Sequence, residues 1–174
     1  MGKNKLRKFA EMKEMANVVE CPRDILLQGG FPLKGKWRTE FFAAPHPIVL
    51  ELGCGKGEYT VGLARRNPEC NYIGIDIKGA RMYSGAREAL DHGIGNAGFL
   101  RTEIELIDNF FLPAEVSEIW ITFPDPQMKK VNKRLTSTRF LNSYRHIMDA
   151  DGIVNLKTDS PFLFEYTRRL AVLN

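Results

Sequence analysis

Short apolar blocks alternate along this chain with longer blocks whose apolar side chains recur at helical spacing. The short blocks are rich in branched and aromatic side chains and are bounded by glycine, proline or polar residues, which is typical of strands. A regular strand–helix alternation predicts an α/β fold with a mostly parallel sheet and helices on both faces. The predicted strands cover residues 48–52, 72–76, 97–101, 118–123 and 152–157, and the predicted helices cover residues 58–66, 78–91, 138–148 and a last segment that begins at 160.

Local signals set the ends of these helices. The first should stop before Pro68, and Gly93 is a predicted C-terminal cap of the second. Ser160 is a predicted N-cap of the last helix, with Pro161 in its first turn. The third helix is predicted to bury four side chains at helical spacing, Leu141, Tyr144, Ile147 and Met148.

The most informative stretch is the glycine-rich turn after the first predicted strand. That strand carries Glu51 near its end and runs into Gly53, Gly55 and Gly57, and the next predicted strand closes on Asp76. Strand, glycine turn, helix, strand and carboxylate describe a Rossmann-like nucleotide site. The glycines allow the backbone to approach a ligand closely, and the second carboxylate can hold two ribose hydroxyls.

The spacing of the glycines favours a cationic nucleotide. A dinucleotide fingerprint needs a small residue where this chain has Glu58, and Gly57 comes one residue too early. A carboxylate near the turn repels a pyrophosphate but suits a cationic ligand. A ligand-free glycine turn and a nicotinamide site are the less favoured alternatives.

Polar residues follow every predicted strand. Because ligands of open parallel sheets bind at the carboxyl ends of the strands, five polar positions at one edge indicate a binding site there. These positions are Glu51, Asp76, Thr102-Glu103, Asp125 and Lys157-Thr158-Asp159.

A second pattern follows the fourth predicted strand. Pro124 and Pro126 stiffen the chain around Asp125. Residues 127–148 then hold six lysines and arginines and no acidic residue. A solvated charged face is the ordinary interpretation of such a run. Its attachment to a carboxylate at the predicted binding edge favours a substrate that carries phosphates, and hence contact with nucleic acid.

Composition adds modest limits. The 174 residues suit one domain, and the net charge of +4 is mild, so its placement matters more than its size. The three cysteines and three histidines fit neither a disulfide framework nor a metal site. With neither a membrane-spanning run nor a signal peptide, we expect a cytoplasmic protein.

Three segments resemble a known family. The sequence Glu-Leu-Gly-Cys-Gly-Lys-Gly resembles motif I of class I S-adenosylmethionine-dependent methyltransferases. Together with Phe-Pro-Asp-Pro-x-x-Lys-Lys and Leu-Lys-Thr-Asp, it resembles the bacterial tRNA (guanine-N7-)-methyltransferases over residues 49–164. The resemblance implies a Rossmann-like class I fold, S-adenosylmethionine as cofactor with S-adenosylhomocysteine as product, no metal, and tRNA as partner. The implied reaction is methylation at N7 of the variable-loop guanine, tRNA position 46.

The resemblance also implies roles for single residues. Asp125 matches the residue proposed to act at the catalytic centre, and Lys129 and Asp159 match positions that contact the substrate. The basic run that follows Asp125 extends the predicted substrate contacts. The predicted cofactor-binding residues are Glu51, Gly53, Gly55, Gly57, Asp76, Glu103 and Asp125, and the predicted substrate-binding residues are Lys129, Lys130, Lys133, Arg134 and Asp159.

The chain departs from the family pattern in three places. Gln127, Met128 and Val131 replace the usual residues of the Pro-Asp-Pro loop, and Glu103 stands where aspartate is common. The family also carries a Thr-x-Tyr-Glu segment near its C-terminus that this sequence lacks. We therefore expect that the C-terminal strands of the fold are missing and that the last predicted strand has an unpaired edge.

The N-terminal part is less determined by its sequence. Residues 1–13 hold five basic residues, which predicts either an arm that folds on RNA or a solubilising tail. We divide the chain into a basic arm and irregular lead-in, residues 1–40, and a methyltransferase domain, residues 41–174. The sequence leaves open a monomer or a homodimer. The alternative function is a methyltransferase acting on another RNA or a small molecule, or an RNA-binding partner without catalysis.

Overall fold

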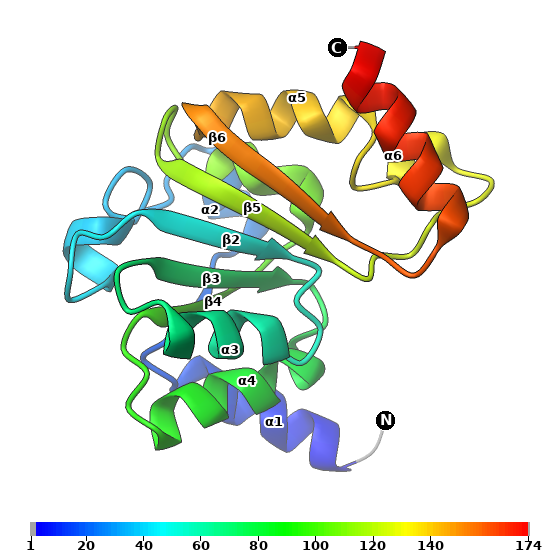
Figure 1. Ribbon diagram of the computed structural model, residues 1–174. Coiled ribbons are helices and arrows are strands. Elements are labelled where there is room, and N and C mark those ends of the chain that lie inside the picture. Colours follow the sequence, from blue (N-terminus) through cyan, green and yellow to red (C-terminus); the bar gives the residue numbers. More distant parts are fainter. Residues whose placement is uncertain (1–2, 174) are drawn as a thin grey trace.

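Residues 3–173 are described by a computed structural model (Figure 1). Six strands form one sheet in the order β1-β4-β3-β2-β5-β6, and every neighbouring pair is parallel. The carboxyl ends of all strands therefore meet at one edge, as the strand–helix alternation predicts. The strands are β1 (Val18–Glu20), β2 (Ile48–Leu52), β3 (Asn71–Asp76), β4 (Ala97–Arg101), β5 (Val116–Thr122) and β6 (Met148–Lys157).

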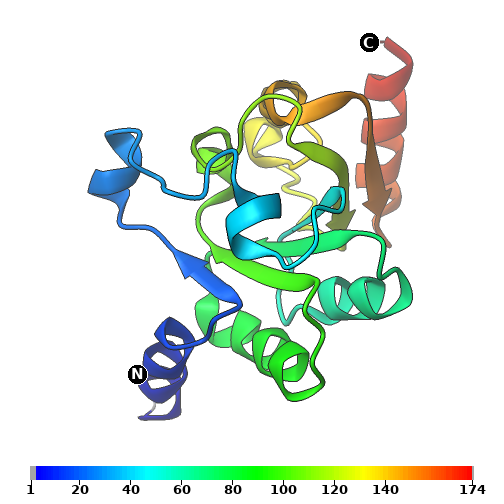
Figure 2. The same ribbon diagram turned by 90° about the vertical axis from the view of Figure 1, so that its left-hand side faces the viewer.

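Helices cover both faces of this sheet (Figures 1 and 2). Helices α1, α3 and α4 lie on one face, while η1, η2 and α5 lie on the other with α2 near one edge. The helices are α1 (Lys3–Lys13), α2 (Arg23–Leu27), the π-helical turn η1 (Trp37–Phe41), α3 (Glu58–Arg66), α4 (Gly79–Asp91), the 3-10 turns η2 (Ile104–Asn109) and η3 (Val131–Lys133), α5 (Thr138–Ile147) and α6 (Pro161–Leu173).

The alternation of side chains along β2 explains the two cores. Ile48, Leu50 and Leu52 point to the face covered by η1 and α5, where Trp37 is fully buried. Val49 points to the opposite face and packs among the buried residues of α3 and α4. Successive strand residues point to opposite faces, so a strand buried on both sides is apolar throughout, except where a polar group finds partners. Glu51 is that exception.

Several sequence predictions are confirmed. The ranges 48–52, 58–66 and 97–101 match β2, α3 and β4. Gly93 has a φ of 63° just past α4, and the amide of Ile94 donates to the carbonyl of Ala89, as a glycine cap requires. Ser160 caps α6, since the amide of Leu163 donates to its hydroxyl at 3.2 Å.

Other predictions were wrong in detail. The predicted irregular lead-in within residues 1–40 is not wholly irregular, because β1 pairs with β4 at one edge of the sheet. Strand β6 starts four residues early, at Met148, and its pairing with β5 shifts register after Val116. On α5 the buried residues are Phe140, Tyr144 and Ile147, while Leu141 is only partly buried, as is Met148, which belongs to β6.

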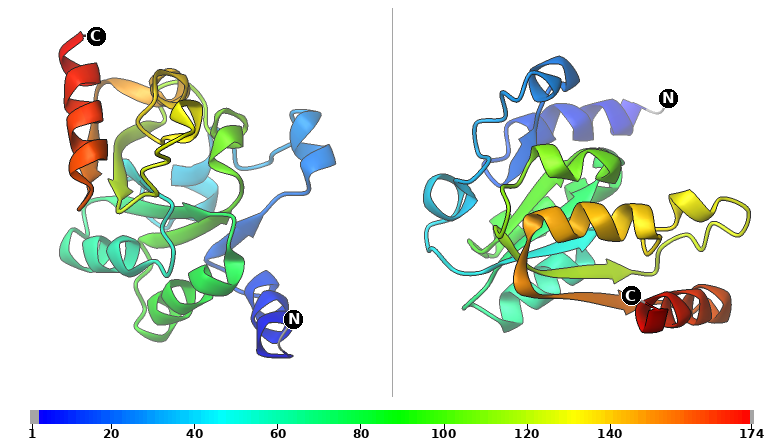
Figure 3. Two further views of the ribbon diagram at one scale, coloured as in Figure 1. Left: turned by 90° about the vertical axis from the view of Figure 1, so that its right-hand side faces the viewer. Right: turned by 90° about the horizontal axis from the view of Figure 1, so that it is seen from above.

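The two ends of the described chain compare differently with the predictions. The prediction of an arm that folds only on RNA was wrong for residues 3–13, which form α1 against α4 with Met12 fully buried. At the other end, β6 has one neighbour, β5, within residues 3–173, as expected, and Ile153 on it is largely exposed. Helix α6 lies beside the loop that leads into α5 (Figure 3), where the hydroxyls of Thr136 and Thr167 are 2.7 Å apart.

Candidate active site

The glycine turn joins β2 to α3 at the carboxyl edge of the sheet. Gly53, Gly55 and Gly57 have φ angles of 75°, 56° and 78°, a region that side chains with a Cβ rarely adopt. A Cβ on Gly57 would also stand 2.6 Å from the ring of Phe99. The turn therefore requires glycine and brings bare backbone to the binding edge.

Glu51 is buried beneath this turn. One carboxylate oxygen accepts hydrogen bonds from the amide of Thr60 at 2.8 Å and from its hydroxyl at 2.5 Å. The other oxygen accepts from the hydroxyl of Thr122 at 2.7 Å. Glu51 is 3% exposed, and its bonds join the ends of β2, α3 and β5. The protein itself thus supplies hydrogen-bond donors to both oxygens.

The burial of Glu51 has a consequence for the pH dependence of stability. Burial raises the pKa of Glu51 above the usual value of 4.5, and the hydrogen bonds from Thr60 and Thr122 oppose this only in part. The folded protein therefore holds a proton on Glu51 more tightly than the unfolded chain does. The resulting stability is present below the unfolded pKa and is lost as the pH rises through the folded pKa.

We accordingly expect Glu51→Gln to flatten the pH dependence of stability, since glutamine keeps an acceptor oxygen but cannot ionise. The free energy of urea unfolding would be measured for both proteins between pH 4.5 and neutral pH. As the pH rises, the value for the wild type should fall relative to the value for the variant. A wild type that gains stability relative to Glu51→Gln over this interval would contradict the assignment of a destabilising buried charge.

Asp76 closes β3 and reaches back to the glycine turn. Its Oδ2 accepts from the amide of Gly55 at 3.0 Å, and its Oδ1 accepts from the amide of Lys78 at 2.8 Å. These bonds fix the carboxylate beside the turn while the side chain stays partly exposed. The structure thus brings the second predicted carboxylate next to the predicted glycines.

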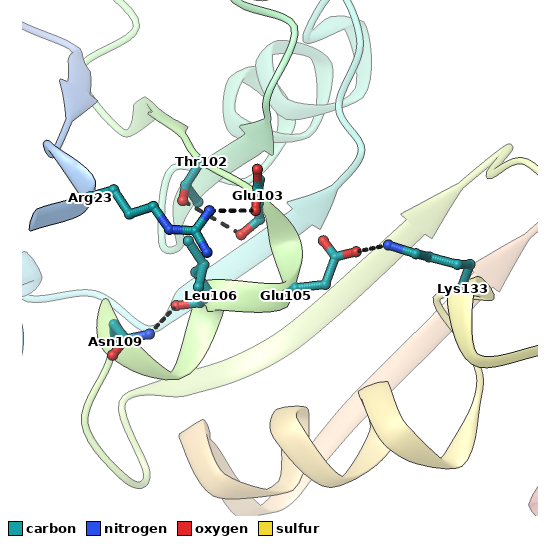
Figure 4. Close-up of polar contacts among 7 residues, drawn as sticks. All are labelled: Arg23, Thr102, Glu103, Glu105, Leu106, Asn109 and Lys133. Atoms are coloured by element: carbon teal, nitrogen blue, oxygen red, sulfur yellow. Dashed lines mark hydrogen bonds and ion pairs between the residues drawn. The ribbon is translucent and has the colours of Figure 1, made fainter. Parts of the chain in front are cut away.

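Glu103 follows β4 at the same edge. It is exposed, and its carboxylate lies 3.6 Å from the guanidinium of Arg23, at the start of α2 (Figure 4). A cavity of about 680 Å³ lies between these segments and includes Ile77, Thr102 and Glu103 in its wall. A cavity of this size is in the range of small-molecule sites. Arg23 is a site neighbour that the sequence alone did not indicate.

A second cavity links these residues to the Pro-Asp-Pro loop. It holds about 210 Å³ and is lined by Asp76 and Glu103 on one side and by Gln127 on the other. Both cavities share Ile77, Thr102 and Glu103. The ends of β3 and β4, with Asp76 and Glu103, and the loop of Asp125 therefore border one continuous region of the edge.

The Pro-Asp-Pro loop contains strained backbone. Phe123 and Gln127 have φ angles of 46° and 47°, which is unusual for residues with side chains. The amide of Gln127 donates to Oδ1 of Asp125 at 3.0 Å, which holds the exposed carboxylate in a tight turn. The amide of Phe123 donates to the carbonyl of Lys157 at 2.7 Å, so the loops after β5 and β6 meet.

An aromatic and cationic group that sequence reasoning missed lies at this junction. The Phe123 ring is 51% exposed and is centred 6.2 Å from the ring of Tyr59. The ammonium of Lys157 lies 5.1 Å from the centre of the Tyr59 ring and 5.6 Å from the centre of the Phe123 ring. Tyr59 belongs to α3 and Phe123 to the end of β5, so no sequence spacing signals their proximity. Asp159, two residues beyond Lys157, is exposed.

The basic run divides into two parts. Lys129 and Lys130 are exposed, and Lys133 is exposed with its ammonium 3.0 Å from Glu105 (Figure 4). Arg134 differs from the prediction of a substrate contact, because it is only 4% exposed. Its guanidinium donates to the carbonyls of two loop residues and lies over two aromatic rings of α6.

Residues 3–173 contain no group of three or more His, Cys, Asp or Glu side chains arranged to hold a metal ion. Within the same residues, no helix has the length and apolar character needed to cross a membrane.

Comparisons with known proteins agree with this arrangement. Residues 45–173 match the family model described as a putative methyltransferase. A tRNA (guanine-N(7)-)-methyltransferase of Porphyromonas gingivalis is 61% identical over 165 residues, covering 94% of this chain and 68% of the relative. The enzyme of the same name from Bacteroides thetaiotaomicron is 57% identical over 174 residues, covering 100% of this chain and 69% of the relative.

Solved structures share the fold at lower identity. TrmN from Thermus thermophilus superposes with a TM-score of 0.58 at 25% identity, covering 72% of this chain and 37% of that protein. The 30S ribosomal A1408 methyltransferase from an uncultured bacterium gives a TM-score of 0.53 at 20% identity, covering 69% and 57%. The mostly parallel sheet with helices on both faces is therefore the class I methyltransferase fold.

Proposed function

The chain belongs to the bacterial tRNA (guanine-N7-)-methyltransferase family, and on that premise we propose that it methylates N7 of the variable-loop guanine at tRNA position 46. The methyl donor is S-adenosylmethionine, and the reaction takes place in the cytoplasm. The observation that carries the proposal is the continuous edge on which Asp76, Glu103 and the loop of Asp125 border the same cavity.

The residues at this edge fit S-adenosylmethionine. Gly53 and Gly55 leave space beside the backbone that side chains would fill, since a Cβ on either would have no neighbour closer than 4.0 Å. Asp76 offers acceptors for ribose hydroxyls, and Glu103 offers one for a purine amine. Carboxylates near the turn suit the positive charge of this cofactor. We assign Glu51 a positioning role, since its oxygens are engaged by Thr60 and Thr122.

The chemistry places modest demands on the protein. Bound S-adenosylmethionine supplies an electrophilic methyl group on a sulfonium. Guanine N7 has an in-plane lone pair and no proton, so attack needs no obligatory general base. Alignment of the reacting atoms can contribute about 7–11 kcal/mol. Positive charge develops on the purine, so a carboxylate such as Asp125 beside the ring stabilises the transition state.

Exposed lysines after Asp125 are suited to contact tRNA phosphates. We expect Lys129→Ala and Lys130→Ala each to reduce the slope of log affinity against log salt concentration by about one. Binding releases counterions from the phosphates that the protein contacts, so a variant with one contact fewer releases fewer counterions. Filter binding of tRNA at several salt concentrations measures this slope. The matched control is Lys36→Ala, which removes an exposed lysine paired with Glu40. Equal slopes for all three variants would contradict the assignment.

The experiment that tests the proposed function is transfer of labelled methyl groups from S-adenosylmethionine to unmodified tRNA transcripts. A transcript with adenine at position 46 is the matched control. Label in the first transcript and none in the second supports the proposal. Equal label in both transcripts, or cofactor binding without label in either, would contradict it and would favour a methyltransferase acting on another RNA or on a small molecule.

A further inference from the structure

Arg134 is a buried cation whose partners are not carboxylates. It is 4% exposed although it follows three exposed lysines of the basic run. Its contacts are two backbone carbonyls and two aromatic rings. Burying a charge is expensive unless its surroundings are arranged to receive it. Such an arrangement indicates that Arg134 has a specific task at this place.

The carbonyl contacts fix the corner of the Pro-Asp-Pro loop. Nε of Arg134 donates to the carbonyl of Pro126 at 3.3 Å, and an Nη donates to that of Met128 at 3.1 Å. The residue between them, Gln127, has the positive φ and donates to Asp125. Strained backbone persists only where the surrounding structure over-determines it. Arg134 thus holds the turn that sets the position of Asp125.

The aromatic contacts tie the same side chain to α6. The guanidinium carbon lies 4.7 Å from the ring centre of Phe162 and 4.4 Å from that of Tyr166. These rings are one helical turn apart, and a planar guanidinium can lie against both while it donates in its own plane. A lysine ammonium lacks this planar fork. Helix α6 begins two residues after Asp159.

We propose that Arg134 is a positioning residue that clamps the Pro-Asp-Pro loop to α6 and thereby sets Asp125 relative to Asp159 for the guanine base. The clamp rests on the proposed function, because it acts on the pocket for the tRNA base. Its effect is on geometry and not on contact with phosphate.

The test compares Arg134→Lys, Arg134→Met and the surface control Arg87→Met, which removes an exposed arginine of α4 paired with Asp91. For both Arg134 variants we expect kcat for tRNA methylation to fall about 100-fold, since displacement of reacting groups by about 1 Å has effects of this size. The dissociation constant for S-adenosylmethionine and the salt slope of tRNA binding should stay as in the wild type. Arg87→Met should leave both the salt slope and kcat unchanged.

Two results would overturn the clamp. If Arg134→Lys retains wild-type kcat, or if Arg134→Met loses about one unit of salt slope, Arg134 acts as a charge that meets phosphate. If melting temperature, cofactor affinity and kcat fall together, its role is only to hold the fold. If Arg134→Met does not fold, Tyr166→Leu replaces it as the test variant, because it removes one of the two rings that contact Arg134. Tyr166→Leu should lower kcat and leave the affinity for the cofactor unchanged.

Failure of the clamp is separable from failure of the proposed function. A wild type that methylates tRNA while both Arg134 variants keep full kcat would remove the clamp alone. A wild type that binds cofactor and leaves tRNA unlabelled would remove the proposed function, and with it the basis for the clamp.

Discussion

Asp125→Ala is expected to lower kcat for tRNA methylation by about 10²–10³-fold, the range seen when one group that stabilises transition-state charge is removed. The affinity for tRNA should change little, because phosphate contacts from lysines elsewhere in the loop dominate it. Single-turnover rates with saturating cofactor, together with tRNA binding curves, measure the two quantities separately.

Asp125→Asn separates the charge of Asp125 from its role in the loop. Asparagine keeps an acceptor oxygen for the amide of Gln127, which Asp125 now binds at 3.0 Å. If charge stabilisation matters, the asparagine variant also loses most of its turnover while the loop stays in place. Asp91→Asn, on the exposed end of α4, is the matched control. Equal losses of turnover and tRNA affinity in Asp125→Ala would show that Asp125 only holds the loop together.

Asp76→Ala is expected to weaken binding of S-adenosylmethionine by about 100-fold. Hydrogen bonds to a charged group contribute about 1.5–3 kcal/mol each, and loss of about 3 kcal/mol corresponds to a hundredfold in affinity. The amide of Gly55 donates a hydrogen bond to Asp76 at 3.0 Å in the wild type. The variant also removes this hydrogen bond, which holds the glycine turn. Isothermal titration with the cofactor measures the effect directly.

The controls for Asp76 distinguish cofactor contact from folding. Asp91→Ala removes an exposed carboxylate paired with Arg87 and should leave cofactor affinity unchanged. Asp76→Asn keeps an acceptor for one amide and should fall between wild type and alanine. Wild-type cofactor affinity in Asp76→Ala would contradict a ribose-binding role, whatever its melting temperature.

Local patterns were sufficient for most of the sheet. The boundaries of β2, α3 and β4 followed from apolar blocks that end at glycine, proline or charged residues. By contrast, β1 has only three residues, all partly exposed, which is too short for an alternation of apolar and polar side chains to be detected. It forms a strand because it pairs with the edge of β4. The early start of β6 likewise depends on pairing with β5 across a shift in register.

The candidate site divides in the same way. Spacing placed the glycines, Asp76, Glu103 and Asp125 at one edge, because strand ends of a parallel sheet must meet. Spacing could not show that Glu51 is bonded by Thr122, which lies 71 residues away. Nor could it show that Arg134 turns inward from a basic run to meet Phe162 and Tyr166 of α6. Such contacts depend on how distant elements pack. A run of charged residues in a sequence predicts an exposed segment, so the burial of one of its members is not foreseen.

The proposed methylation changes one atom, N7 of the variable-loop guanine, and chemical mapping detects that change directly. Unmodified tRNA would be incubated with the protein and S-adenosylmethionine, then reduced and cleaved with aniline, which breaks the strand at N7-methylguanine. We expect a single new cleavage, at the variable-loop guanine of position 46. Methylation of the tRNA without this cleavage, or cleavage at another guanine, would contradict it.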